Sequence, residues 1–581
     1  MTIASDAPAA TGYPSSSRAS LDATVAALQE RKAAWTAVSP RERMAILTEI
    51  SLGFAAISGR WAAACIEAEG LDPEFGAAEE VLVGPYFVVR NLRLLRLALA
   101  DVEKHGRPRI PGSIRTRPDG QVTARIFPYD IWDRIFYTGV TADVWMQPGV
   151  TEASLPSTQA VAYHAELRAG RLGEIALVLG GGNVSSIGPM DALYKLFVED
   201  QVVLYKAHPV NVYLGPLLEE GMQALVSRGF LKVVYGGAEE GAYLCQHPGV
   251  DEIHITGSDR TYEAIVFGPG DEGRRRKERK EPLLTKRVTA ELGNISPVIV
   301  VPGPAGSWSA ADLRYQAESL VTMLVNNAGF NCNAARVIVQ HAASPQREDL
   351  LAAIRQLLRE TPLRKAWYPG AAERWSTFAA AHPEAENFGE RAGDLLPWTL
   401  IHSLDPQSRE DICYTTEAFC GVFAETPIAA ASVPEYLERA VAFANETLWG
   451  TLNATLIVHP AALRDAGVRQ AVEKAIADLR YGTVSVNHWA ALGYGLVITP
   501  WGAFPGHPPD DIQSGTGVVH NTLMFDQPQK NVIRAPFRVS PKPVWFADHK
   551  TAHKLTPKLV AFEADPSLAK LPGIFALALR G

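Results

Sequence analysis

The sequence predicts an α/β protein built on a doubly wound parallel sheet, and three observations support this fold class. Short apolar runs such as EIALVL, QVVLY, LKVV and DEIHIT alternate with segments of helical period between residues 174 and 260. Each run is followed by glycine or polar residues, as is common at the carboxyl ends of parallel strands. A second alternation begins near residue 287 and continues to about residue 489. We therefore expect a nucleotide-binding sheet followed by a second α/β region.

Helices are expected before the first alternation. Residues 21–57 carry apolar side chains at helical spacing, and the pair Ser39-Pro40 predicts the start of a new helix. Residues 83–106 continue the helical pattern, whereas residues 107–157 mix aromatic residues with glycine and proline in the manner of strands and loops. The charge-dense stretch at residues 273–281 is predicted to be a surface loop.

Composition narrows the possible functions. The chain has 581 residues, of which 47% are hydrophobic and 20% charged, which is typical of a folded globular protein. Its net charge of −8 argues against nucleic acid as the main partner, because phosphate binding favours a basic surface. The N-terminus lacks the pattern of a secretory signal, and no stretch approaches the roughly 18 apolar residues that a membrane span requires. We expect a cytoplasmic protein that binds small molecules.

The five cysteines are scattered, and none stands in a CxxC pair, so we expect neither a disulfide framework nor a metal site. One of them, Cys332, lies in the segment NNAGFNCNAARVIV among small and amide-bearing residues. A free cysteine is usually a buried packing residue. A nucleophilic thiol instead needs small neighbours that leave room for a carbonyl carbon. The neighbours of Cys332 favour the second interpretation.

Four segments, in their order along the chain, resemble the aldehyde dehydrogenase superfamily over roughly residues 21–510. AELGNISPVIV resembles the general-base segment of the family, NNAGFNCNAARVIV its nucleophile segment, TTEAFCGVF its nicotinamide-ribose segment, and YGTVSVNHW with PWGAFPGH its closing segment. The resemblance implies a Rossmann-type cofactor domain, an α/β catalytic domain and a small β element for oligomerisation. It also implies an NAD(P)-dependent enzyme that oxidises an aldehyde to a carboxylic acid.

With this resemblance the chain divides into four parts. We expect a flexible N-terminal tail at residues 1–20, an NAD(P)-binding domain at residues 21–289 with an inserted segment near residues 107–157, a catalytic domain at residues 290–482, and a closing segment with a C-terminal extension at residues 483–581. The inserted segment and the extension exceed what is typical of the family. We expect them to shape the substrate entrance or a subunit contact. The resemblance also implies a homodimer or homotetramer.

The resemblance assigns three catalytic residues. Cys332 would attack the aldehyde carbon, and the thioester left after hydride transfer would be hydrolysed by water that Glu291 activates. The side chain of Asn183, in GGGNVSSIGP, would stabilise the developing oxyanion together with the backbone N–H of Cys332. Near these catalytic residues, two positions depart from the family pattern: Gly182 replaces an aromatic residue, and Asn294 stands near the place of a second glycine.

Six residues match the cofactor site of the family: Lys206, His208, Gly257, Ser258, Glu417 and Phe419. Lys206 would reach the adenosine ribose or a nearby phosphate, and the Gly257-Ser258 turn would meet the pyrophosphate through backbone donors. Glu417 and Phe419 would hold the nicotinamide ribose and ring. Pro209 stands where many NAD-preferring relatives carry a glutamate, and the KAHP form resembles relatives that accept NADP. We therefore expect NADP or NAD as cofactor, with a preference for NADP. Tyr262 replaces the glycine that usually follows the pyrophosphate turn.

Two alternatives stay open. A CoA-acylating relative or a fatty acyl reductase would also use Cys332, but acylating relatives often lack the glutamate at the position of Glu291. A non-catalytic scaffold that binds the cofactor would retain the fold alone, and the three catalytic matches together argue against it. Aromatic residues in the inserted segment indicate an apolar or bulky aldehyde. Trp489 and Trp501 could line its tunnel, although an aromatic residue at a strand end equally often belongs to the core.

Overall fold

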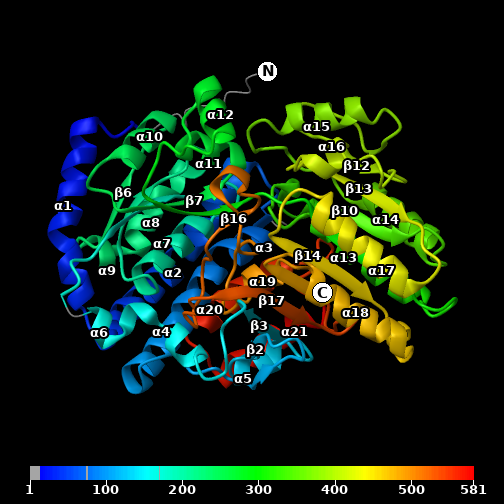
Figure 1. Cartoon of the computed structure of the whole chain (residues 1–581), viewed down its shortest axis with the longest axis horizontal. Coiled ribbons are helices and arrows are strands. Elements are labelled where there is room, and N and C mark those ends of the chain that lie inside the picture. Colours follow the sequence, from blue (N-terminus) through cyan, green and yellow to red (C-terminus); the bar gives the residue numbers. More distant parts are fainter. Residues whose placement is uncertain (1–12, 74–75, 169) are drawn as a thin grey trace.

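The computed structural model describes residues 13–73, 76–168 and 170–581, and two sheets lie side by side in it with helices around each (Figure 1). The predicted tail at residues 1–20 lies partly outside the described residues. Helix α1 (Arg18–Ala37) already begins at Arg18, three residues before the helical pattern suggested. Its first turn is capped by Ser17, whose side chain accepts the N–H of Ser20.

The first sheet has six strands in the order β16-β8-β7-β4-β5-β6. In chain order they are β4 (Ile175–Leu179), β5 (Val202–Lys206), β6 (Leu231–Val234), β7 (Glu252–Gly257), β8 (Arg287–Leu292) and β16 (Gly515–Thr516). The neighbouring strands from β8 to β6 are parallel, and β16 pairs antiparallel with β8. The chain enters at the central β4, moves outward to β5 and β6, and returns through β7 to β8. This is a doubly wound sheet, so the predicted fold class is confirmed.

The second sheet has eleven strands in the order β1-β2-β3-β17-β15-β14-β9-β10-β13-β12-β11. In chain order they are β1 (Ile114–Thr116), β2 (Val122–Phe127), β3 (Thr141–Met146), β9 (Ser296–Val301), β10 (Ala335–His341), β11 (Glu386–Phe388), β12 (Trp398–Ile401), β13 (Val422–Ile428), β14 (Asn453–Val458), β15 (Thr483–Val486) and β17 (Pro528–Arg534). Strands β9, β10 and β14 are buried along their whole length, which explains their nearly continuous apolar sequences.

Strands of the inserted segment extend this second sheet. Strand β17 pairs in parallel with β15 and antiparallel with β3, and β3 pairs with β2. The sheet edge beside β15 is therefore occupied by strands of the same chain. A homodimer or homotetramer stays a prediction. The division into domains at residues 289 and 482 also stays a prediction.

The helices of the N-terminal half are α2 (Pro40–Glu69), α3 (Gly76–Val81), the π-helical turn η1 (Leu82–Tyr86), α4 (Phe87–His105), α5 (Ile131–Phe136), α6 (Ala165–Arg168), α7 (Ile187–Phe197), α8 (Gly215–Gly221), α9 (Gln223–Val226), α10 (Ala238–Gln246), α11 (Asp259–Val266) and α12 (Gly270–Glu278). The predicted break before α2 is present. Ser39 and Glu42 form a capping box around Pro40, which has no N–H to satisfy at this position. The charge-dense stretch at residues 273–281 lies mostly in α12, so its prediction as a loop was wrong. Glu272 pairs there with Arg275 and Arg276, one helical turn away.

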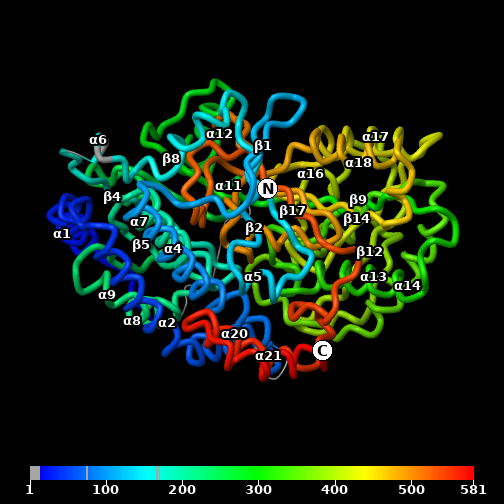
Figure 2. Tube along the Cα trace, turned by 90° about the horizontal axis from the view of Figure 1, so that it is seen from below, coloured from blue at the N-terminus to red at the C-terminus, as the bar shows by residue number. Residues whose placement is uncertain are grey.

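The helices of the C-terminal half are α13 (Ala310–Val325), α14 (Arg347–Glu360), α15 (Ala371–Ala381), α16 (Ile412–Thr415), α17 (Val433–Glu446), α18 (Ala466–Asp478), α19 (Leu492–Gly495), α20 (Ala552–Ala564) and α21 (Leu571–Ala578). The last two form the C-terminal extension. Helix α20 packs against α2, α3, η1 and α4, and Figure 2 shows α20 and α21 (red) beside the blue N-terminal helices. Within the described ranges, no helix is both long and apolar enough to span a bilayer.

Candidate active site

Cys332 lies in the loop between α13 and β10, just beyond the short turn η5 (Asn326–Gly329). Its backbone carbonyl accepts hydrogen bonds from the Ser296 hydroxyl at 3.3 Å and from the Asn453 side chain at 3.4 Å. Because Ser296 and Asn453 begin β9 and β14, the loop is anchored to two neighbouring strands of the second sheet. The thiol is partly exposed and lines a cavity of about 290 Å³. A thiol in this setting can meet a small molecule, which a packing residue cannot.

The loop before the thiol is held in an uncommon backbone conformation. Asn327 and Ala328 both have a φ of 50°, in the left-handed region. Such conformations cost non-glycine residues about 1 kcal/mol or more each, so surrounding contacts must maintain them. The backbone N–H of Asn327 donates to the Glu79 carboxylate, and its side-chain amide donates to the Asn183 carbonyl at 2.6 Å. Arg364 pairs with the other oxygen of Glu79 at 2.5 Å. These contacts fix the loop.

Glu291 reaches the same cavity from the first sheet. It lies on β8, is 5% exposed, and accepts a hydrogen bond from Nε1–H of Trp501 at 3.1 Å. Burial raises the pKa of Glu291 to about 8, while hydrogen bonds from Trp501 and Cys332 oppose this shift. Burial, and then the neighbouring Glu291, raise the pKa of the Cys332 thiol well above its ordinary value. Both groups are therefore protonated at neutral pH. Ionising either one requires a higher pH or a new positive charge nearby.

Asn183 follows β4 and contacts the loop that carries the thiol. Its side-chain nitrogen donates to the Phe330 carbonyl at 2.9 Å. An amide nitrogen carries two hydrogens, so one donor remains beyond this contact. Asn183 and Glu291 thus come from the first sheet and Cys332 from the second. Glu291 and Cys332 line the same cavity, whereas Asn183 contacts the loop that carries the thiol and is not among the described residues that line the cavity.

Four of the predicted cofactor residues lie at the carboxyl ends of β5 and β7. Lys206 is 7% exposed, and burial lowers its pKa to about 8. Burial, together with Lys206, lowers the pKa of His208 to about 4. Gly257 and Ser258 are exposed, and Ser258 caps α11 by accepting the N–H of Thr261 at 3.2 Å. These four residues occupy one edge of the first sheet, as predicted.

Glu417 and Phe419 precede β13 and approach this edge from the second sheet. Burial raises the pKa of Glu417 to about 7, with Arg336 opposing the shift. Its Oε1 atom is buried and has no hydrogen-bonding partner within the described part of the chain. A β-carbon at Gly293 would collide with this carboxylate, so the glycine allows Glu417 to reach the end of β8. The ring of Phe419 packs against Phe330, with centroids 5.9 Å apart.

Parts of this chain are similar to known proteins. Residues 201–378 match the model of the aldehyde dehydrogenase family. N-succinylglutamate 5-semialdehyde dehydrogenase from Sphingopyxis alaskensis is 28% identical over 182 residues, which cover 31% of this chain and 34% of that protein. 1-Pyrroline-5-carboxylate dehydrogenase 1 from Halalkalibacterium halodurans is 26% identical over 337 residues, which cover 54% of this chain and 58% of that protein. In both cases the match spans less than two thirds of the relative.

Solved structures match along nearly the whole chain. NAD-dependent aldehyde dehydrogenase from Sinorhizobium meliloti has a TM-score of 0.60 at 16% identity, covering 92% of both chains. NADP-dependent glyceraldehyde-3-phosphate dehydrogenase from Bacillus halodurans C-125, complexed with NADP, has a TM-score of 0.59 at 17% identity, covering 90% of this chain and 94% of that one. Residues 201–378 thus match the aldehyde dehydrogenase family, and the chain as a whole has the aldehyde dehydrogenase fold. The resemblance stated from the four sequence segments is thereby confirmed.

Three departures from the superfamily pattern have physical reasons in the structure. A β-carbon at Gly182 would collide with the His208 ring, so the small residue makes room for the histidine. Asn294 is fully buried and donates to the Asn453 carbonyl at 3.0 Å, which links the end of β8 to β14. Tyr262 is 3% exposed and belongs to a small apolar cluster that α11 shares with β7 and β8.

Sequence reasoning missed Glu79 and Asn327. Nothing local marks Glu79, because its contact with Asn327 joins positions 248 residues apart. The signal for Asn327 was the segment NNAGFN, since several amides before a thiol indicate a hydrogen-bonded loop. Trp489 and Trp501, considered as tunnel walls, both line the cavity.

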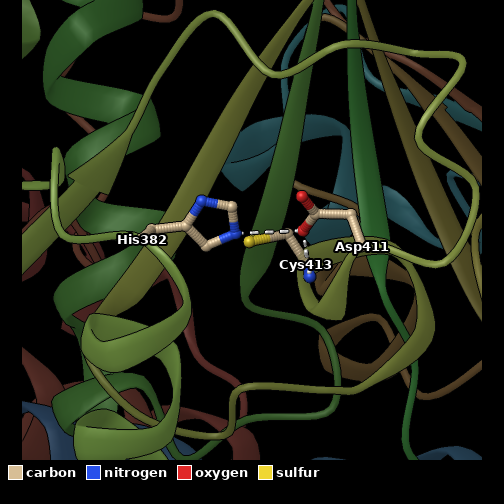
Figure 3. A group of neighbouring side chains, drawn as sticks. All are labelled: His382, Asp411 and Cys413. Atoms are coloured by element: carbon tan, nitrogen blue, oxygen red, sulfur yellow. Dashed lines mark hydrogen bonds and ion pairs between the residues drawn. The ribbon is translucent and has the colours of Figure 1, made fainter.

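A separate group of possible metal ligands is not part of this cavity. The ligand atoms of His382, Asp411 and Cys413 lie within 4.8 Å of one another (Figure 3). The imidazole of His382 lies 3.1 Å from the Asp411 carboxylate and 3.0 Å from that of Glu384. Asp411 also caps α16 by accepting the N–H of Cys413 at 2.8 Å. The helix cap and the ion pairs explain why these three side chains lie close together. None of His382, Asp411 and Cys413 lines the cavity.

Proposed function

We propose that this protein oxidises an aldehyde to a carboxylic acid with NAD(P)⁺ through a covalent intermediate on Cys332. One observation carries the proposal: Glu291 of the first sheet and Cys332 of the second meet at one cavity. Burying a carboxyl group beside a thiol costs stability. Such perturbed pairs are characteristic of sites that perform chemistry.

Cys332, Asn183 and Glu291 each have a separate role in this reaction. The Cys332 thiol first loses its proton to solvent. The thiolate then attacks the aldehyde carbon, which forms the C–S bond and moves the carbonyl electrons onto oxygen. The resulting oxyanion accepts hydrogen bonds from the Asn183 side chain and the Cys332 backbone N–H. When bound, the nicotinamide supplies the acceptor for the hydride that leaves this carbon. Glu291 then takes a proton from the water that attacks the thioester, and the carboxylic acid and the thiolate separate.

The residues at the strand ends fit a nicotinamide dinucleotide. The unpartnered Oε1 of Glu417 is an acceptor that a ribose hydroxyl would satisfy. Ser258 and the first turn of α11 offer backbone donors to the pyrophosphate. The ammonium of Lys206 suits a ribose or phosphate oxygen. Many NAD-preferring relatives carry a glutamate at the position of Pro209, where its carboxylate would repel a 2′-phosphate. Because Pro209, preceded by His208, stands there in this chain, we propose a preference for NADP.

The position of Glu291 supports hydrolysis rather than transfer to coenzyme A, because thiolysis needs no activated water. The test is NAD(P)H absorbance with purified protein, both cofactors and a panel of aldehydes, with and without coenzyme A. Formation of NAD(P)H and free carboxylic acid without coenzyme A, and its loss after iodoacetamide treatment, would support the proposal. Strict dependence on coenzyme A would replace it with an acylating enzyme. Cofactor binding without turnover would favour the scaffold.

A further inference from the structure

The cavity at Cys332 is closed by the inserted segment and the C-terminal extension, which were expected to shape either the substrate entrance or a subunit contact. Helix α5 of the inserted segment contributes Phe136, and the C-terminal extension contributes Leu559 of α20 with Ile574 and Phe575 of α21. Phe87, at the start of α4, lines it from a further side. We call these five side chains the apolar chamber. Phe136 and Phe575 stack at 6.1 Å, so α5 and α21 meet across it.

The extension that closes the chamber is part of the folded core. Glu563 of α20 pairs with Arg90 at 2.7 Å and with Arg93 at 2.5 Å, and Arg90 also pairs with Asp133 of α5 at 2.7 Å. These four side chains are buried. Buried charges of this kind are strongly destabilising when one partner is removed. The network therefore holds α20, α4 and α5 in one arrangement around the chamber.

The cavity offers no free charge to a substrate beyond the reacting end. Among the described residues that line the cavity, Glu291 is the carboxylic acid, Lys542 the amine and His488 the imidazole. The other ionisable groups in the lining are a thiol and phenols. The ammonium of Lys542 is already paired with Asp548 at 2.6 Å and with Glu318 at 3.4 Å. Burial lowers the pKa of His488 to about 4, so its ring is neutral at pH 7. A carboxylate or phosphate on the substrate would be desolvated here without a partner.

We propose that the apolar chamber binds the uncharged, apolar remainder of the aldehyde, and that the substrates are medium-chain or bulky aryl aldehydes without a charged group. This inference rests on the proposed function. The whole cavity, including the part beside Cys332, has a volume of about 290 Å³. This volume corresponds to roughly ten methylene groups, if each takes the space of one water molecule in the liquid. Burial of each methylene should raise kcat/KM about fourfold until the chamber is full.

The test compares propanal, decanal and 10-oxodecanoate, the last being as long as decanal but ending in a carboxylate. We expect kcat/KM for decanal to exceed both others at least a hundredfold. Comparable values for decanal and 10-oxodecanoate, or for decanal and propanal, would overturn the inference.

Variants locate the effect. Leu559→Trp should lower the decanal-to-propanal ratio of kcat/KM at least tenfold, because the larger ring fills the chamber. Leu568→Trp is the matched control, because Leu568 is 69% exposed between α20 and α21 and does not line the cavity. Its ratio should equal that of the wild type. If Leu559→Trp fails to fold, Leu559→Asn should lower the ratio through polarity instead of bulk. An unchanged ratio in the folded Leu559 variant would contradict the inference.

A binding measurement separates failure of the chamber from failure of the proposed function. We expect 1-decanol to slow the alkylation of Cys332 by iodoacetamide at a concentration at which 1-propanol has no effect. Protection by decanol without oxidation of any aldehyde would support the chamber and reject the proposed function. Aldehyde oxidation with neither protection nor chain-length dependence would reject the chamber and leave the proposed function standing.

Discussion

The indole N–H of Trp501 donates a hydrogen bond to the Glu291 carboxylate at 3.1 Å, in a wall of the cavity that also holds the Cys332 thiol. The hydrogen bond stabilises the ionised carboxylate, whereas burial favours its protonated form, and burial is the larger effect. The proposed base is therefore protonated at neutral pH and within reach of ionisation slightly above it. The hydrogen bond from Trp501 therefore helps to set the pH at which Glu291 ionises.

Replacing Trp501 by Phe keeps an aromatic ring and removes the donor. The pKa of Glu291, already raised to about 8, should rise further, by roughly one unit. The ascending limb of the pH–rate profile should move to higher pH by that amount. Trp489→Phe is the control, because Trp489 also lines the cavity but donates to the Asn333 carbonyl at 2.7 Å. A limb that moves equally in both variants would show that Trp501 does not tune Glu291.

Glu291→Gln should stabilise the folded protein at alkaline pH. Because burial raises the pKa of Glu291 from 4.5 to about 8, the folded state binds this proton more tightly than the unfolded state does. Its contribution to stability is fully present below pH 4.5 and is lost as the pH rises through 8. The variant escapes that loss, and should gain on the order of 4 kcal/mol in unfolding free energy relative to wild type between about pH 4 and pH 9. Urea unfolding at the two pH values measures this. If the difference in unfolding free energy between the variant and the wild type were the same at both pH values, the pKa of Glu291 would not be raised in the folded state.

Glu79→Ala should slow the chemistry without touching the reacting atoms. The substitution leaves the N–H of Asn327 without its acceptor in a strained loop, at a cost of roughly 1–3 kcal/mol. We expect kcat to fall about tenfold and the alkylation of Cys332 by iodoacetamide to change in rate. Glu80→Gln is the control. The pKa of Glu80 is raised to about 8 by burial, so glutamine resembles its neutral form at pH 7. Equal kinetics in both variants would contradict this role for Glu79.

Lys206→Met should weaken cofactor binding with little effect on the chemical step. Methionine keeps an apolar stem of similar length at this buried position and removes the charge. We expect the KM for NADP⁺ to rise about tenfold, since a charge-assisted hydrogen bond is worth roughly 1.5–3 kcal/mol. Initial rates at saturating aldehyde measure it. An unchanged KM would place the cofactor elsewhere.

The doubly wound sheet could be predicted because its signal is local. Strands such as β4 and β5 are short and buried along most of their length, and glycine or polar residues stand at or just beyond their ends, so each shows in a few consecutive letters. Cys332 and Glu291 were identified through the family resemblance, since no pattern of spacing joins residues on two different sheets. The structure then brings them together.

Other features depend on contacts between distant parts of the chain. Glu79 acts on Asn327 from 248 positions away. The pairing of β17 with β15 and the return of α20 onto α4 are decided by packing, and the sequence after residue 502 shows little periodicity of its own. The closing of the cavity by α21 could not be read from such a segment.

The most direct test of the account is to trap the intermediate on Cys332. Glu291→Gln should still form the thioester and release one equivalent of NAD(P)H, but should not hydrolyse it. Peptide mass spectrometry after incubation with aldehyde and NADP⁺ should find the acyl group on Cys332, with no adduct when cofactor is omitted. Repeated turnover by the variant at the wild-type rate, or a burst of NADPH with Cys332 unmodified, would contradict the account.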